Sequence, residues 1–192
     1  MIKIGITGSI ASGKTTAARI FAGKRYPLFN ADKEVKDLYN QKYFKSKISK
    51  KFKIQSTKNI KSKIKKIIIN NKVLIKDVEK IIHPLIRRKI KIFIKKNKKK
   101  KFIFFEIPLL IESKLMKDYD VIIFINSKKK IRLKRYLKRG RDKKIFNLLD
   151  KRQLPPSKKI KFCDYIINNN KDLKKLKKVI KSIKTKYERN NS

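Results

Sequence analysis

The sequence has few of the features that mark secreted or membrane proteins. Cys163 is the only cysteine in 192 residues, which excludes an internal disulfide and favours a reducing cytosol. No apolar run approaches the ~18 residues that a membrane-spanning helix needs, and nothing at the amino end has the pattern of a signal peptide. We therefore expect a soluble, cytoplasmic protein without a membrane partner.

Acidic residues are also scarce. The chain has 14 acidic and 58 basic residues, a formal net charge of +44 that would attract any polyanion. However, 48 of the basic residues are lysines spread along the chain, and the bias toward Lys, Ile, Asn and Phe is typical of AT-rich coding sequence. We interpret much of the charge as drift on solvated faces, so that nucleic acid would bind only non-specifically, if at all. A steep salt dependence combined with sequence preference would contradict this interpretation.

Glycine and alanine are rare and concentrated near the start of the chain. All five alanines lie within the first 31 residues, and four of the five glycines lie at or before Gly23. There, a β-branched run over 2–7 is followed by residues 8–15, Gly-Ser-Ile-Ala-Ser-Gly-Lys-Thr, which match the phosphate-loop pattern G-x-x-x-x-G-K-[ST]. The flanking segments indicate a strand before the loop and a helix after it. This context disfavours the alternative, a glycine-rich turn with an incidental lysine.

Phosphate binding explains why glycine, lysine and threonine occur at these positions of the loop. Gly8 and Gly13 let the backbone curl until its N–H groups point at phosphate oxygens, and the following helix adds its positive end. Lys14 can reach the outer phosphates, and the Thr15 hydroxyl can ligate Mg²⁺. The candidate nucleotide-binding residues of the loop are Ala11, Ser12, Gly13, Lys14, Thr15 and Thr16.

The rest of the chain predicts a single doubly wound α/β domain. The continuous apolar run at 102–105 and the segment 120–125, which is apolar after Asp120, are typical of strands buried on both faces of a parallel sheet. Together with 2–7, the segments 28–31 and 164–167 complete a five-stranded sheet. Between them, 33–100 has apolar residues at helical spacing and is too long for a simple crossover. We predict a core of 1–32, 101–126 and 145–192, a helical insertion at 33–100 that holds the second substrate, and a small lid at about 127–144.

Four of the ten arginines lie within ten positions, at Arg132, Arg135, Arg139 and Arg141. Arginine is favoured where a planar fork must hold phosphate oxygens, so its presence in a lysine-rich chain is informative. Gly140 between the last two would give the lid a hinge. The alternative is an ordinary solvated helix face, and it applies to Arg132 more than to Arg139 or Arg141.

Taken together, several stretches resemble the dephospho-CoA kinase family, a family of P-loop kinases. The resemblance covers about residues 1 to 170. Its matching stretches are Gly5 to Thr16, Asn30-Ala31-Asp32 with Leu38, Ile82-His83-Pro84-Leu85-Ile86, Pro108-Leu109-Leu110 with Glu112, the pair Arg135 and Arg139, and Gln153 followed by Asp164 to Asn169.

The resemblance implies transfer of the ATP γ-phosphoryl group, with Mg²⁺, to the ribose 3′-hydroxyl of dephospho-CoA. It implies that Asp32 is the catalytic base and that Arg139 meets the transferred phosphate. Lys14 of the loop is the third candidate catalytic residue, and we expect Arg141 of the arginine cluster to bind the nucleotide. Asp32 could also be the N-cap of the helix that follows. Two positions depart from the family pattern: Asn30 replaces a common acidic residue and Glu106 a frequent aspartate, which affects the surroundings of the metal.

His83, the single histidine, falls near the acceptor substrate by the same resemblance, and it just precedes Pro84, a residue suited to the first turn of a helix. A packing or capping role for His83 is the main alternative to acceptor binding. Two alternative functions are a nucleoside or nucleotide kinase of the same fold and a nucleic-acid-binding ATPase. ATP and dephospho-CoA are the expected partners, and we expect a monomer.

Overall fold

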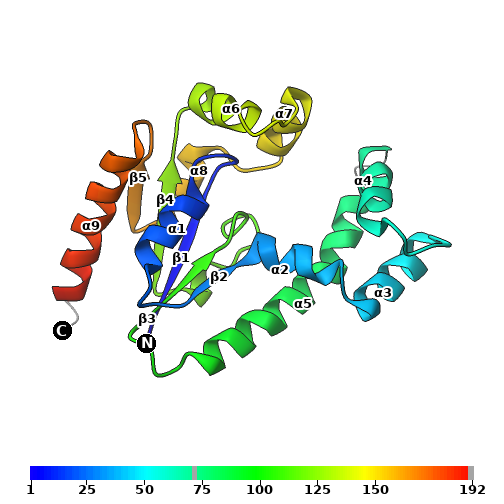
Figure 1. Cartoon of the computed structure of the whole chain (residues 1–192), viewed down its shortest axis with the longest axis horizontal. Coiled ribbons are helices and arrows are strands. Elements are labelled where there is room, and N and C mark those ends of the chain that lie inside the picture. Colours follow the sequence, from blue (N-terminus) through cyan, green and yellow to red (C-terminus); the bar gives the residue numbers. More distant parts are fainter. Residues whose placement is uncertain (71–72, 190–192) are drawn as a thin grey trace. The chain divides into compact units, whose positions relative to one another are not determined.

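A computed structural model describes residues 1–70 and 73–189, which divide into two compact units (Figure 1). The sheet unit comprises residues 1–29 and 97–192, and the helical unit comprises residues 30–96. The elements of the sheet unit are β1 (Ile2–Gly8), α1 (Lys14–Ala22), β2 (Leu28–Asn30, whose last residue is the first of the helical unit), β3 (Phe102–Glu106), the 3₁₀ turn η1 (Met116–Asp118), β4 (Val121–Asn126), α6 (Lys129–Leu137), α7 (Lys143–Lys151), α8 (Pro156–Ile160), β5 (Tyr165–Asn168) and α9 (Leu173–Arg189).

The sheet has five strands in the order β2-β3-β1-β4-β5 and is parallel. The first strand of the chain is therefore the central one, with Ile4 opposite Phe104 on β3 and opposite Val121 on β4. Parallel strands all end at the same edge of a sheet, so the loop that follows β1 and the residues that end β3 and β5 meet at the carboxyl edge. This confirms the predicted doubly wound α/β fold.

One face of the sheet packs against α1 and α9. Alternate residues of the strands, such as Ile4 and Ile6 on β1, form a core with Ala17 and Phe21 of α1 and Ile180 of α9. Gly23 ends α1, with φ of 56° and its N–H donating to Arg19 O at 2.9 Å. On α9, Leu176 and Ile180 are buried, whereas Leu173 is exposed.

The segment 107–119 crosses the other face of the sheet at the position of Gly5. A Cβ atom on Gly5 would lie 2.7 Å from Leu110 Cδ1 and 3.1 Å from Tyr119 Cγ. Tyr119 also packs edge-on against Phe105 of β3 at 5.2 Å. The central strand therefore needs a residue without a side chain at this position.

The helical unit contains α2 (Ala31–Leu38), α3 (Lys42–Phe52), α4 (Ile60–Asn70) and α5 (Leu74–Lys96). Its apolar stripes bury Leu38, Phe44, Ile48 and Ile64 almost completely. The ion pair between Glu34 and Lys89, at 2.6 Å, joins α2 to α5. The predicted insertion at 33–100 overlaps this unit, and its role in holding an acceptor stays a prediction.

Two local expectations were wrong. Pro84 lies in the interior of α5 and not in its first turn, because the apolar spacing that defines this helix begins at Leu74. Asn30, and not Asp32, is the N-cap of α2, and its Oδ1 accepts a hydrogen bond from Lys33 N at 2.8 Å.

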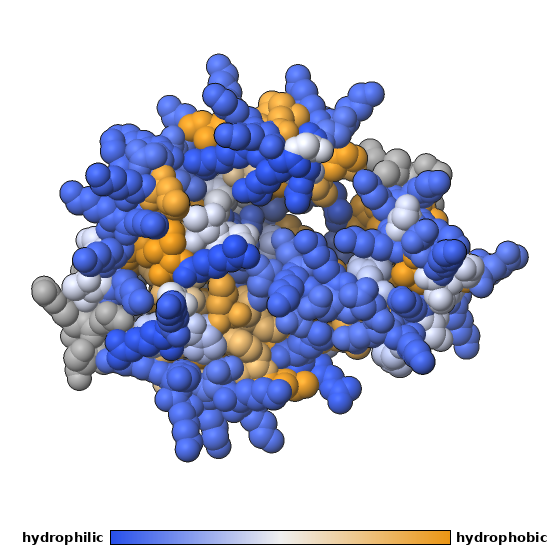
Figure 2. Space-filling model, viewed as in Figure 1, coloured by the Kyte–Doolittle hydropathy of each residue, from blue (hydrophilic) through white to orange (hydrophobic). Residues whose placement is uncertain are grey.

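Hydrophilic residues cover most of the surface visible in Figure 2, as the lysine-rich composition predicts. Within the described residues, no helix has the length and apolarity that crossing a membrane requires.

Candidate active site

The phosphate loop lies between β1 and α1, and its two glycines are required by close approaches. Gly8 has φ of 153°, and a Cβ atom there would lie 2.4 Å from Ile125 O on β4. Gly13 has φ of 98°, and a Cβ atom would lie 2.3 Å from Asn169 Nδ2. Both distances are too short for any side chain. The loop therefore depends on glycine at both positions, as the sequence pattern predicts.

Lys14 is the first residue of α1, and its side chain folds back over the loop. Nζ donates a hydrogen bond to Ser9 O at 3.0 Å, and the residue is buried. The Ser12 N–H closes the same turn by donating to Ser9 O at 3.1 Å. Buried Ser12 Oγ has no hydrogen-bond partner within the described ranges. The loop thus places an ammonium group and a hydroxyl group in one small, curled segment at a helix N-terminus, which is a suitable arrangement for an anion.

Thr15 and Glu106 form a pair of oxygen donors at the carboxyl edge of the sheet. Thr15 Oγ1 donates to Glu106 Oε1 at 2.5 Å, and Glu106 is the buried last residue of β3. A hydroxyl and a carboxylate beside a phosphate loop are hard ligands of the kind Mg²⁺ prefers. The part of the chain that the structure describes holds no cluster of three His, Cys, Asp or Glu side chains suited to a metal. A metal here would therefore need nucleotide oxygens or water as further ligands.

Asn169 and Gln153 lie next to the phosphate loop. Both belong to the stretches that resemble the kinase family, but the sequence did not predict a role for either. Asn169, which follows β5, is buried and donates from Nδ2 to Ser12 O at 2.8 Å. Gln153, which follows α7, accepts from the Ile10 N–H at 2.8 Å. These contacts join residues 157 and 143 positions apart. Sequence reasoning missed their roles because spacing does not reveal such distant pairs; the one available signal was a polar side chain just after a predicted helix or strand.

The four arginines between positions 132 and 141 divide into two kinds. Arg132 and Arg135 contact the protein itself: Arg132 is 4% exposed, and Arg135 donates to Asn169 O at 3.0 Å. Burial, and then the nearby charge of Arg139, lower the pKa of Arg135. The solvated-face alternative is therefore wrong for Arg132.

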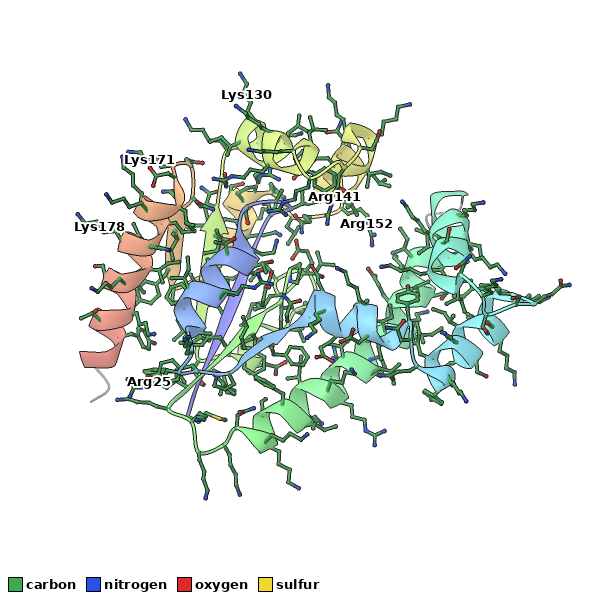
Figure 3. All side chains as sticks on the ribbon, in the orientation of Figure 1. Arg25, Lys130, Arg141, Arg152, Lys171 and Lys178 are labelled. Atoms are coloured by element: carbon green, nitrogen blue, oxygen red, sulfur yellow. The ribbon has the colours of Figure 1, made fainter. Side chains whose placement is uncertain are left out.

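Arg139 and Arg141 are exposed in the turn between α6 and α7. The Arg141 guanidinium lies 5.3 Å from the centre of the Tyr136 ring, and neither arginine bonds to the loop within the described residues. In Figure 3, Lys130 points away from the sheet, whereas Arg141 lies on the opposite side of the α6–α7 pair. Their predicted roles at the nucleotide stay predictions.

Asp32 and His83 belong to the helical unit. Asp32 lies in the first turn of α2 and is exposed; among residues 1–70 and 73–189 its carboxylate forms no hydrogen bond or ion pair. Because Asn30 caps the helix, Asp32 is not occupied by capping. His83 is half-buried within α5. The structure does not position these two residues relative to the phosphate loop, which lies in the other unit.

The parallel sheet, the glycine-bounded loop and the Lys-Thr pair at the start of α1 define a P-loop nucleotide-binding protein. Solved structures show the same fold. The crystal structure of a Thermus thermophilus protein matches with a TM-score of 0.77 over 96% of this chain and 97% of its own, at 22% identity. A shikimate kinase from Bacteroides thetaiotaomicron matches with a TM-score of 0.57 over 97% of this chain and 98% of its own, at 14% identity.

The family model for dephospho-CoA kinase matches residues 2–175, and the chain belongs to that family. A dephospho-CoA kinase from Bartonella quintana is 37% identical over 185 residues, covering 94% of this chain and 95% of the relative. A dephospho-CoA kinase from Rickettsia felis is 37% identical over 184 residues, covering 95% of this chain and 96% of the relative. The structure of the Campylobacter jejuni dephospho-CoA kinase has a TM-score of 0.68, at 26% identity over 99% of this chain and 98% of its own. The chain is thus an ATP-dependent kinase of dephospho-CoA in coenzyme A biosynthesis, as the sequence resemblance predicted.

Proposed function

We propose that the enzyme transfers the γ-phosphoryl group of ATP to the ribose 3′-hydroxyl of dephospho-CoA, with the phosphate loop holding the triphosphate. The observation that carries this proposal is the loop itself, in which Lys14 and the helix N-terminus converge on one curled backbone segment. In phosphoryl transfer the protein contributes mainly positioning and charge neutralisation. Lys14 would neutralise charge on the outer phosphates, with the loop residues Ala11, Ser12, Gly13 and Thr16 providing the rest of the cradle.

Mg²⁺ bound with ATP would neutralise further charge on the phosphates. The Thr15 hydroxyl would hold it directly, and Glu106, 2.5 Å from that hydroxyl, would orient the hydroxyl or a metal-bound water. This assignment is supported by the oxygen chemistry of the pair. Glu106 keeps a negative charge on a longer arm than aspartate, whereas the amide oxygen of Asn30 caps α2.

Asp32 would accept the proton of the acceptor hydroxyl and orient it for attack. Its exposed carboxylate, not used for capping, supports this role. The proton leaves late in a loose transition state, so this step does not require a strong base. Arg139 would bring positive charge to the transferred group when the lid closes, and Arg141 would bind the nucleotide beside it. Gly140 would be the hinge of the lid, because its φ of 66° and its open surroundings allow the backbone to move there.

The helical unit, including His83, would bind the acceptor. We further propose that the enzyme works as a monomer in the cytoplasm, where its single cysteine stays reduced. Size-exclusion chromatography with light scattering tests the monomeric state, since a dimer would show twice the monomer mass.

The proposed acceptor position can be tested with purified protein, ATP and Mg²⁺. Dephospho-CoA should be phosphorylated, whereas dephospho-CoA whose ribose lacks the 3′-hydroxyl should not. A nucleoside panel run alongside should give turnover lower by orders of magnitude. Phosphorylation of the 3′-deoxy analogue would contradict the assigned hydroxyl, and faster phosphorylation of a nucleoside would contradict the acceptor.

A further inference from the structure

The backbone of Ile10, in the middle of the phosphate loop, is held from two directions by side chains outside the loop. Its N–H donates to Gln153 Oε1 at 2.8 Å, and its C=O accepts from Arg132 Nη1 at 3.3 Å. Gln153 follows α7, and Arg132 lies within α6. One peptide group of Ile10 is therefore bound from within the predicted lid at 127–144, and the other from the segment after α7.

Arg132 is built into the protein and does not point into solvent. Its Nη1 donates to Asp150 Oδ1 at 2.6 Å and its Nε to Ser127 O at 3.0 Å. Its guanidinium carbon lies 5.7 Å from the centre of the Phe146 ring. A planar fork of this kind can hold a carbonyl and a carboxylate at once, which a lysine ammonium cannot do in the same geometry.

The segment around Gln153 is fixed in turn. Gln153 N donates to Asp150 O at 3.2 Å, and Leu154 N donates to Glu112 Oε1 at 3.1 Å. Glu112 also forms an ion pair at 2.5 Å with Lys159, whose side chain is fully buried. The amide oxygen that meets the Ile10 N–H thus sits on a segment tied to α7 and to the loop after β3.

The residue after Ile10 needs such support. Ala11 has φ of 58°, the left-handed conformation that side-chain-bearing residues adopt at a cost. The Ile10 C=O belongs to the same peptide plane as the Ala11 N–H, so holding that plane restricts rotation at Ala11. Strained backbone of this kind persists only when the surroundings determine it.

We propose that Arg132 and Gln153 are positioning residues, which keep the phosphate loop in its nucleotide-binding shape by holding Ile10 and thereby Ala11. They act through the loop backbone, and the inference rests on the phosphate-binding role proposed for that loop. It assigns Arg132 a function distinct from the phosphate contact expected of the exposed arginines Arg139 and Arg141.

Steady-state kinetics of the full chain test the proposal, with Gln153→Ala and Arg132→Lys as the variants. Each should raise the KM for ATP about tenfold and change the KM for dephospho-CoA less than twofold. Arg132→Lys keeps the charge, so its defect would identify the fork geometry as the cause. Lys151→Ala, an exposed change on α7, is the control and should match the wild type.

Rescue separates positioning from a general structural defect. In the Gln153→Ala background, Ala11→Gly removes the left-handed penalty and should recover about fivefold in kcat/KM for ATP. An unchanged KM for ATP in Gln153→Ala, or a loss that Ala11→Gly does not reduce, would overturn the proposal. This pair decides the question even if Arg132→Lys does not fold. Lys14→Ala, assayed in parallel, reports on the loop itself: if it stays active, the phosphate-binding role fails; if it is inactive while Gln153→Ala is normal, only the positioning role fails.

Discussion

The contacts inside the sheet unit differ in kind from the contacts inside the helical unit. Around the phosphate loop, polar side chains from distant segments bond to backbone groups, as Asn169 does to Ser12 and Gln153 does to Ile10. The helical unit packs apolar stripes around residues such as Phe44 and adds the Glu34–Lys89 ion pair. Backbone fixed by hydrogen bonds suits the positioning of a triphosphate, whereas packed helices offer a surface for an acceptor. We therefore expect substitutions in the sheet unit to change kcat or the use of ATP, and most substitutions in the helical unit to change the KM for dephospho-CoA.

The largest effect should come from Lys14→Ala in the sheet unit. Removal of a charge from the outer phosphates should lower kcat by about 10³-fold or more, because this charge acts where negative charge must be neutralised in the transition state. Initial rates at saturating ATP and dephospho-CoA measure it. Lys24→Ala, at an exposed position after α1, should stay within twofold of the wild type. If both variants lost activity alike, the overall charge and not the loop would be responsible.

Asp32→Asn would break the simple division between the units, because Asp32 lies in the helical unit yet is proposed to act on kcat. Loss of the base should lower kcat by about 10²-fold or more, with the Kd for ATP unchanged within twofold. Single-turnover assays and titration with ATP separate the two effects. Asp37→Asn makes the same chemical change later in α2 and should be nearly silent. A normal turnover at saturating ATP, together with weaker ATP binding, would contradict the role of Asp32.

Arg139→Ala sharpens the contrast within the sheet unit between buried and exposed arginines. The kcat should fall about 10- to 100-fold while the Kd for ATP changes little, because the guanidinium charge stabilises the transition state more than bound ATP. The unfolding temperature should not change, because Arg139 is exposed. Lys138→Ala is the neighbouring control. A large change in ground-state ATP binding with constant kcat would instead make Arg139 an ordinary nucleotide contact.

His83→Ala should show the behaviour expected of the helical unit. We expect the KM for dephospho-CoA to rise about three- to tenfold, with kcat nearly constant, because a half-buried imidazole on α5 would contribute binding more than chemistry. Substrate titrations at saturating ATP measure this. A loss confined to kcat would indicate a chemical role, and a fall in unfolding temperature without a kinetic change would indicate packing alone.

The smallest effect should be seen at Cys163, in the sheet unit just before β5. Burial, and then the charge of Asp164, raise its pKa to about 11, although Lys159 opposes the shift. A raised pKa keeps the thiol protonated at neutral pH, so alkylation at pH 8 should be about tenfold slower than for a small free thiol, after the greater nucleophilicity of the thiolate is included. Cys163→Ser should keep kcat/KM within twofold. Rapid labelling that also inactivates the enzyme would contradict this prediction.

Much of the fold could be predicted from local pattern, for identifiable reasons. Strands buried on both faces, such as 102–105, need continuous apolar runs, and the phosphate loop needs glycine at Gly8 and Gly13, so both leave a direct signal in the sequence. The helix boundaries were less accessible: Pro84 was expected to begin a helix, but packing of α5 around buried Val78 and Ile81 outweighs the missing hydrogen bond.

The surroundings of the loop could not be predicted in the same way. The roles of Gln153, Asn169 and Arg132 depend on contacts between residues more than a hundred positions apart. In the sequence, the buried Arg132 cannot be distinguished from the exposed arginines near it. Only the tertiary arrangement distinguishes a side chain that braces backbone from one that faces solvent.

The central place of β1 in the sheet has a consequence for how the chain matures on the ribosome. Among the five strands of the sheet β1 is synthesised before the others, and it cannot complete its pairing until residues 102–106 and then 121–126 have left the exit tunnel. During that interval its apolar residues have no partner strand, and native pairing over such long separations closes slowly. The helical unit is made in the meantime, and it forms a compact unit through contacts within residues 30–96. Abundant lysine along the nascent polypeptide would then keep neighbouring unfinished copies apart by mutual repulsion.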